Sequence, residues 1–200
     1  MLANARAVGF LGPGPVEPHL LHADGFAQVA EAALGGEPRE FVDLGTGGGV
    51  PGLVLAIRWP AAGAVLVEAN GRRAEGLRAA ISRFDLGGRV KVLETRAEAA
   101  AQLPGYRERF ALATARGFAG PAATAEIAAG FVSVDGALVV SEPPVPEEGR
   151  WPEAGLDRLG FGPARPEQAP GGRFVVIPKV APAPAGVPRA TGRPTKRPLW

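Results

Sequence analysis

A glycine-rich stretch directly after a short apolar run is the feature that most constrains the fold of this chain. Residues 41–52 read Phe-Val-Asp-Leu-Gly-Thr-Gly-Gly-Gly-Val-Pro-Gly. Residues 40–44 predict a strand, and Pro51 suits the first turn of a helix, where a missing N–H has no helical partner to lose. Glycines between strand and helix let the backbone turn tightly and approach a ligand closely. The stretch therefore predicts a strand, a ligand-binding turn and a helix.

The alternation of strand and helix continues along the chain. Short apolar runs predict further strands, and apolar residues three or four apart predict the helices between them. The predicted strands are 40–44, 64–68, 90–93, 110–115, 137–140 and 173–177, and the predicted helices are 51–57, 71–84, 121–129 and 152–159. A further helix is expected before the sheet, capped by Asp24 and ended by Gly35. This order predicts an α/β fold with an open sheet of about seven strands, the last one antiparallel.

Two carboxylates bear on which cofactor the turn suits. The glycine spacing over 47–52 also satisfies the dinucleotide fingerprint, so the glycines alone leave a nicotinamide cofactor and S-adenosylmethionine open. Asp43 would repel a pyrophosphate but suits a cofactor with sulfonium and ammonium groups. Glu68 ends the second strand, where a carboxylate can accept hydrogen bonds from both ribose hydroxyls of an adenosine. The charge favours S-adenosylmethionine. The structural alternatives are that the glycines only form a tight turn and Asp43 caps the following helix, and that Glu68 is a solvated strand end.

Composition restricts the chemistry further. The 200 residues include no cysteine, which excludes disulfides, thiolate metal sites and a thiolate nucleophile. Apolar types make up 46% and charged types 21% of the chain, as in ordinary globular proteins. No run approaches the roughly 18 apolar residues of a membrane helix, and the first residues lack the pattern of a signal peptide. We therefore expect a cytoplasmic protein with no membrane segment and no metal.

Charge is distributed unevenly along the chain. Residues 1–167 carry 16 basic and 20 acidic side chains, whereas 168–200 carry six basic and no acidic ones. Residues 181–200 also contain five prolines and no apolar periodicity. We expect one domain over 1–180, with an N-terminal helical segment, and a proline-rich basic tail over 181–200 that lies on or beside it. Such a tail could contact phosphates, or it could be a solvated surface segment.

Five stretches resemble one known family. The glycine turn, with Pro-Gly directly after it, closely resembles the first motif of the RsmG (GidB) family of 16S rRNA guanine-N7 methyltransferases. Four further stretches agree and extend the resemblance over nearly the whole chain: Glu-Ala-Asn-Gly-Arg-Arg at 68–73, Thr-Arg-Ala-Glu at 95–98, Thr-Ala-Arg-Gly-Phe-Ala at 114–119, and Pro-Arg-Ala-Thr-Gly-Arg-Pro-Thr-Lys-Arg-Pro-Leu at 188–199.

The resemblance implies a class I S-adenosylmethionine-dependent methyltransferase fold and transfer of a methyl group to N7 of a guanine in 16S rRNA. We expect the protein to act as a monomer. In the family, the arginine after the fourth strand belongs to the cofactor and catalytic site, which implies Arg116 as the catalytic residue. The cofactor-binding residues implied are Asp43, Gly45, Thr46, Gly47, Gly49, Val50, Glu68, Ala97, Glu98 and Arg116. The residues expected to contact RNA are Arg72, Arg73, Arg189, Arg193, Lys196 and Arg197.

Some of these residues have plain structural alternatives. Arg116 ends a central strand, at the ligand crevice of an open α/β sheet, but an arginine there could also form a structural ion pair. Arg72 and Arg73 could be a solvated helix start. His19 and His22 precede the sheet and are expected to be ordinary polar residues near a helix start rather than catalytic groups.

The chemistry agrees with a ring-nitrogen target. Methylation at C5 of a pyrimidine generally needs a cysteine nucleophile, and the chain has none. Guanine N7 offers a lone pair and has no proton to lose, so catalysis would consist mainly of positioning. The target base is expected in a single-stranded or loop context, because an A-form duplex hides N7 in a groove that side chains hardly enter.

The chain also departs from the family pattern. It lacks the N-terminal Asn-Leu-Thr element, although Pro18 to Leu21 resembles the Arg-His-Leu-Leu motif. Ser141-Glu142 stands where the family's fifth strand ends in a lysine. These departures leave two alternatives: a methyltransferase that acts on another RNA or a small molecule, and a catalytically silent RNA-binding paralogue.

Overall fold

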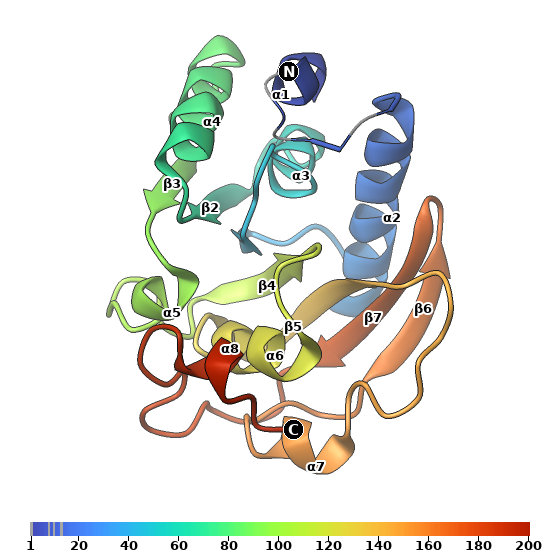
Figure 1. Ribbon diagram of the computed structural model, residues 1–200, viewed down its shortest axis with the longest axis vertical. Helices are drawn as coiled ribbons and strands as arrows, with labels where there is room; N and C mark the ends of the chain where they lie inside the picture. Colours follow the sequence, from blue (N-terminus) through green and yellow to red (C-terminus); the bar gives the residue numbers. More distant parts are fainter. Residues whose placement is uncertain (1, 8, 10, 13) are drawn as a thin grey trace.

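One seven-stranded sheet runs through the protein (Figure 1), as described by a computed structural model for all residues except 1, 8, 10 and 13. The strands follow the spatial order β3-β2-β1-β4-β5-β7-β6. Their bounds are β1 Glu40–Leu44, β2 Gly63–Glu68, β3 Val90–Glu94, β4 Phe110–Ala115, β5 Val132–Glu142, β6 Arg165–Ala169 and β7 Gly172–Pro178. The helices are α1 Leu2–Ala7, α2 Glu17–Leu34, α3 Gly52–Arg58, α4 Gly71–Arg83, α5 Ala97–Ala100, α6 Pro121–Ala129, α7 Glu153–Asp157 and α8 Arg193–Lys196.

The pairing of the strands confirms the expected α/β architecture. Strands β1 to β5 are parallel to one another, whereas β7 is antiparallel to both β5 and β6. The chain order reverses beside β1, which is the central strand that carries the glycine turn. In such sheets a crevice opens outside the carboxyl ends of the strands at that switch point. The topology alone therefore predicts a ligand site at the loops after β1, β2 and β4.

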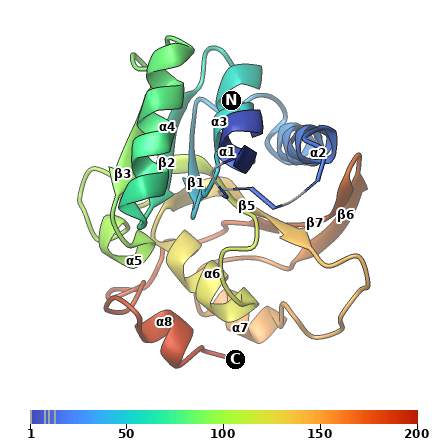
Figure 2. The ribbon, with the colours of Figure 1, turned by 45° about the horizontal axis from the view of Figure 1, so that its top comes forward.

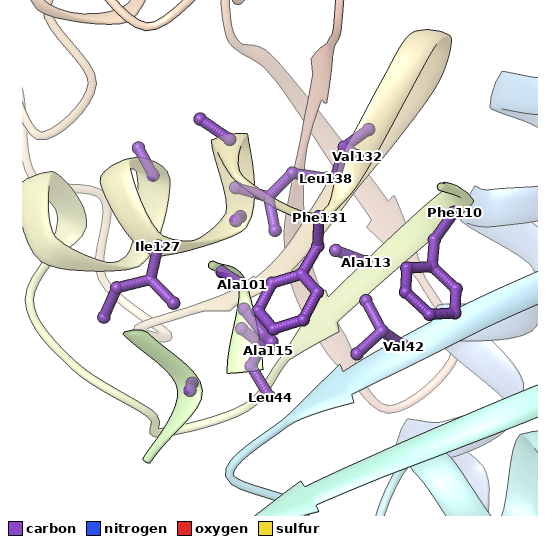
Figure 3. Close-up of a cluster of buried hydrophobic side chains, with 14 of the residues drawn as sticks. Val42, Leu44, Ala101, Phe110, Ala113, Ala115, Ile127, Phe131, Val132 and Leu138 are labelled. Carbon is purple, nitrogen blue, oxygen red and sulfur yellow. The ribbon is translucent and has the colours of Figure 1, made fainter. Parts of the chain in front are cut away.

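Helices cover both faces of the sheet, and each face has its own hydrophobic core (Figure 2). Side chains alternate between the faces along a strand, so Phe41 joins the core under α2, α3 and α4, while Val42 joins the opposite core. Figure 3 shows that second core. Phe110 and Phe131 lie beside Val42, and Ile127 joins the same core from helix α6. Burial on both faces explains why the central strands read as continuous apolar runs.

The helix before the sheet begins earlier than predicted. Helix α2 starts at Glu17, with Pro18 in its first turn, and Asp24 lies in its interior instead of capping it. The Asp24 carboxylate accepts a hydrogen bond from Gln28 one turn later. The predicted end is correct, since Gly35 caps the helix in the left-handed conformation, with φ of 73°.

Two further differences concern the C-terminal half of the sheet. Strand β5 starts at Val132 rather than at 137, and passes through Asp135 at φ 67°, where its register with β4 shifts. A bulge of this kind reads as a turn in sequence. Strand β6 was not predicted, because this edge strand is mostly exposed and polar and shows no buried alternation.

Candidate active site

The carboxylate of Asp43 holds the glycine turn together from inside the protein. Its Oδ1 accepts a hydrogen bond from Thr114 Oγ1 at 2.7 Å, and its Oδ2 accepts from Thr46 Oγ1 at 2.9 Å and from the Gly52 backbone N–H at 3.0 Å. A Cβ at Gly52 would lie 2.5 Å from Oδ2, so only glycine fits there. Asp43 is 1% exposed, and this burial raises the pKa of its carboxyl group to about 6 despite the three donors.

Glu68 ties the end of β2 to the same turn. Its Oε2 accepts from the Gly47 backbone N–H at 2.9 Å, and its Oε1 accepts from the Asn70 N–H at 2.8 Å. Each oxygen keeps a further lone pair. The carboxylate is therefore fixed at the edge of the turn and can still accept hydrogen bonds from a diol.

A cavity of about 390 Å³ opens at the carboxyl ends of β1, β2 and β3. Four of the predicted cofactor-binding residues line it, namely Gly45, Glu68, Ala97 and Glu98. Asp43, Thr46 and Val50 are buried, and Gly47 lines a neighbouring groove of about 490 Å³ against α4. The remaining lining residues of the cavity are Val67, Ala69, Arg73, Thr95, Arg96, Gly117, Phe118, Ala119, Ile127 and Thr195.

Arg116 follows β4 directly and contacts His19 of α2. Its Nη2 donates to His19 Nδ1 at 2.8 Å, and its buried Nη1 has no partner among the described residues. Since arginine has no acceptor atom, His19 must present an unprotonated Nδ1 and carry its proton on Nε2. Burial and the neighbouring Arg116 lower the pKa of His19, which favours this neutral form. Burial also lowers the pKa of Arg116, and Asp43 partly opposes that shift.

His19 is thus a hydrogen-bond partner of Arg116 that the sequence did not predict. Its only signal was the short likeness of Pro18 to Leu21 to a family motif, which says nothing of a partner 97 residues away. His22 lies differently: its Nδ1 is 2.9 Å from the Gly171 carbonyl oxygen, and its ring stacks on Phe174. His22 therefore has the structural role expected of it.

The basic residues predicted to meet RNA fall into two groups. Arg72 and the three cations of the C-terminal helix region are exposed, and Arg73 lines the cavity. Arg189 differs, because its guanidinium makes two hydrogen bonds to Glu126, which is fully buried in α6. This pairing raises the pKa of Arg189 and occupies its charge within the protein. The exposed cations near the C-terminus are Arg193, Lys196 and Arg197.

The acidic residue at the end of β5 is compensated within the chain. Glu142 Oε2 accepts from Arg150 Nε at 3.0 Å, and its Oε1 accepts from Trp151 Nε1 at 3.2 Å. The reversal of charge relative to the family's lysine is therefore neutralised by a nearby arginine. No helix among the described residues is long and apolar enough to cross a membrane. In the same part of the chain, no group of three or more metal-ligating side chains gathers.

Fold and site together define a class of protein. An open sheet with a glycine turn after β1, a carboxylate ending β2 and one cavity between them is the arrangement of a class I S-adenosylmethionine-dependent methyltransferase. Solved structures agree on the fold. "PigF with SAH" has a TM-score of 0.60 at 18% identity and covers 80% of this chain and 54% of its own. A putative O-methyltransferase from Klebsiella pneumoniae has a TM-score of 0.59 at 15% identity, covering 90% and 88%.

Sequence comparisons identify the family. The family model described as GidB, rRNA small subunit methyltransferase G, matches residues 17–142. Proteins named ribosomal RNA small subunit methyltransferase G are 36% identical in Roseiflexus sp. (strain RS-1), over 82% of this chain and 73% of the relative, and 36% identical in Rubrobacter xylanophilus, over 78% and 64%. The chain belongs to the rRNA small subunit methyltransferase G family. The resemblance to this family is thereby confirmed.

Proposed function

We propose that this protein transfers the methyl group of S-adenosylmethionine to N7 of a guanine in 16S rRNA. The observation that carries the proposal is the cavity at the switch point of the sheet, lined by the turn after β1, Glu68 and Glu98, in a chain of this family. Bound S-adenosylmethionine supplies an electrophilic methyl group on its sulfonium. The enzyme then needs to hold that group in line with the nitrogen that attacks it.

The residues around the cavity fit this cofactor. Glu68 offers acceptor lone pairs to the ribose hydroxyls, and the glycine turn lets the backbone come close. Ala97 and Glu98 line the same cavity, and from the family resemblance we propose that their loop contacts the adenine. Arg116 has a buried guanidinium nitrogen without a partner among the described residues; the residue does not line the cavity, so its guanidinium would have to turn to pair with a carboxylate such as that of the methionine moiety. Asp43 supports the turn from behind, and we propose that it acts on the cofactor through the turn.

Positioning suffices for the chemistry. Guanine N7 has a free lone pair, so no residue has to remove a proton before attack. Arg116, fixed by His19, presents planar donors that can orient either the cofactor carboxylate or the guanine. We therefore propose Arg116 as the catalytic residue, acting through orientation.

Basic residues lie on two of the elements that line the cavity. Arg73 lines it from α4, with Arg72 beside it in sequence, and α8 carries Arg193 and Lys196 together with Thr195, which also lines the cavity. Phosphates of a single-stranded RNA could contact both groups while the target base enters between them. We propose that the protein acts in this way as a monomer in the cytoplasm, without a metal.

The test is methyl transfer to small ribosomal subunits that lack the modification. Subunits are incubated with the protein and labelled S-adenosylmethionine, and the rRNA is digested to nucleosides. We expect labelled 7-methylguanosine. A different methylated nucleoside would overturn the N7 assignment, and RNA binding without transfer would make the protein a silent paralogue.

A further inference from the structure

The C-terminal segment, residues 187–200, is held against the rest of the domain at both ends. At its start, Arg107 Nη1 donates to the Val187 carbonyl oxygen at 2.6 Å, and Gln102 donates to that of Pro188. Arg189 then pairs with the buried Glu126, with Nη2 to Oε2 at 2.6 Å. At its end, Trp200 packs on α7 and its Nε1 donates to the Arg150 carbonyl oxygen at 3.1 Å. A purely electrostatic tail would need none of these contacts.

Between these anchors the segment borders the cofactor cavity. The Gly192 backbone N–H donates to Glu98 Oε1 at 3.0 Å, and Thr195 lines the same cavity as Glu98. The Glu98 side chain is only 2% exposed, and its second partner is Arg96 at 3.3 Å. Figures 1 and 2 both place α8 beside α6 and on the same side of the sheet as α5. The C-terminal segment thus closes a side that the sheet and its loops leave open.

We propose that the segment Pro188–Lys196 is a wall of the S-adenosylmethionine cavity and that its docking is coupled to cofactor binding. The inference rests on the proposed function, because it takes that cavity as the cofactor site. A ligand that contacts both the domain and α8 stabilises the docked segment. By reciprocity, any contact that stabilises the docked position of α8 raises the affinity of the cavity for the ligand. RNA phosphates bound to Arg193 and Lys196 would provide such contacts, so RNA binding would strengthen cofactor binding.

Limited proteolysis measures the coupling directly. Trypsin can cut at Arg189–Ala190 and at Lys196–Arg197, whereas Arg193 and Arg197 precede prolines and resist it. Saturating S-adenosylhomocysteine should slow cleavage at both bonds by about fivefold or more, in the range of ordinary coupling between sites. Cleavage at Arg83–Phe84, at the far end of α4, serves as the internal control and should not change by that factor. Fragments are followed by mass spectrometry.

A matched pair of variants tests the wall itself. Thr195→Tyr places a ring in the cavity and should weaken S-adenosylhomocysteine binding by about tenfold or more, because ring and ligand compete for the same volume. Thr191→Tyr changes an exposed residue of the same segment that does not line the cavity, and it should bind like the wild type. Both positions are exposed, so both variants should fold. Calorimetry provides the affinities.

The outcomes separate this inference from the proposed function. If wild-type protein does not bind S-adenosylhomocysteine, the cofactor assignment itself fails. If it binds and the ligand leaves both tryptic cleavages unchanged, or if Thr195→Tyr binds as tightly as Thr191→Tyr, the coupled wall is overturned while the cofactor assignment stands.

Discussion

At the scale of single residues, the side chains of the site differ in how much of their hydrogen-bonding capacity the protein itself uses. Asp43 is enclosed by three donors from its own chain. Glu68 accepts from two backbone N–H groups and keeps a lone pair on each oxygen, whereas Arg116 has one guanidinium nitrogen without a partner among the described residues. Substitutions should therefore separate binding from stability. We expect ligand-facing residues to change affinity or rate with little effect on the fold.

Replacing Glu68 by alanine should weaken S-adenosylmethionine binding by about 1.5–3 kcal/mol, since hydrogen bonds to a charged acceptor are lost. Calorimetry on the folded variant measures the loss. Glu94→Ala is the matched control, because Glu94 is the register partner of Glu68 on β3 but is exposed and paired with Arg78. Equal affinity in the two variants would remove Glu68 from the cofactor site.

Arg116→Ala should lower the methylation rate by about a hundredfold, because misplacement by about 1 Å defeats in-line transfer. Circular dichroism should show an unchanged fold, and nucleoside digestion should show little 7-methylguanosine. Full activity in this variant would exclude Arg116 from the mechanism.

The pH profile of methylation activity should fall on its acid side because of His19. Only the neutral imidazole can accept from Arg116, so activity should fall as pH drops through the pKa of His19, which lies below the ordinary 6.5. The same lowering means that the unfolded state binds more protons at His19 in this window, so the contribution of His19 to stability falls there too. Asp43, whose pKa is raised to about 6, contributes with the opposite sign, because the folded state binds more protons there than the unfolded state. His19→Asn keeps an acceptor that does not titrate, so initial rates at falling pH should decline less than in the wild type; identical profiles would contradict the role of His19.

At the scale of elements, the C-terminal segment is packed structure. Arg189 forms an ion pair with the fully buried Glu126. Its guanidinium was predicted to contact RNA, but in the structure it holds the C-terminal segment against α6. Breaking a buried ion pair leaves an uncompensated charge and is costlier than losing a surface pair.

Arg189→Ala should therefore destabilise the protein by about 2 kcal/mol or more, less than for a fully enclosed pair because the arginine side chain is 26% exposed. Urea unfolding gives the value. Arg193→Ala, an exposed neighbour on α8, should stay within about 0.5 kcal/mol of the wild type. A similar small effect in both variants would mean that the pair contributes no stability.

At the scale of the whole molecule, exposed cations lie on or next to two elements, α4 and α8, that both contribute residues to one cavity. Arg72 lies on α4 and Arg197 directly after α8, so residues 125 positions apart in sequence are expected to bind the same RNA. Each exposed cation that meets a phosphate should contribute about 0.7 to the slope of affinity against salt on a logarithmic scale.

Arg72→Ala and Arg197→Ala should each reduce that slope by about 0.7, whereas Arg189→Ala, measured where it remains folded, should leave it unchanged. Binding of a single-stranded rRNA fragment at several salt concentrations provides the slopes. An unchanged slope in both exposed variants would place the RNA elsewhere on the protein.

Local patterns predicted most of the sheet. Strand β1 has the predicted bounds 40–44, and β4 the predicted 110–115, because a strand buried on both faces has to be apolar throughout. The turn after β1 was also legible, since its glycines at 45, 47 and 49 all take positive φ values that other residues avoid. These features depend on neighbours in sequence, which is why the sequence by itself determined the fold class and the family.

Only the tertiary structure decided which side chains meet. The His19 to Arg116 hydrogen bond joins residues 97 positions apart, and the Arg189 to Glu126 pair joins residues 63 positions apart. The sequence around one partner does not indicate the other, because the same charged residue can be solvated by water or paired with a buried carboxylate. The folded chain alone settles that choice, since packing removes water from one partner and makes the pairing favourable.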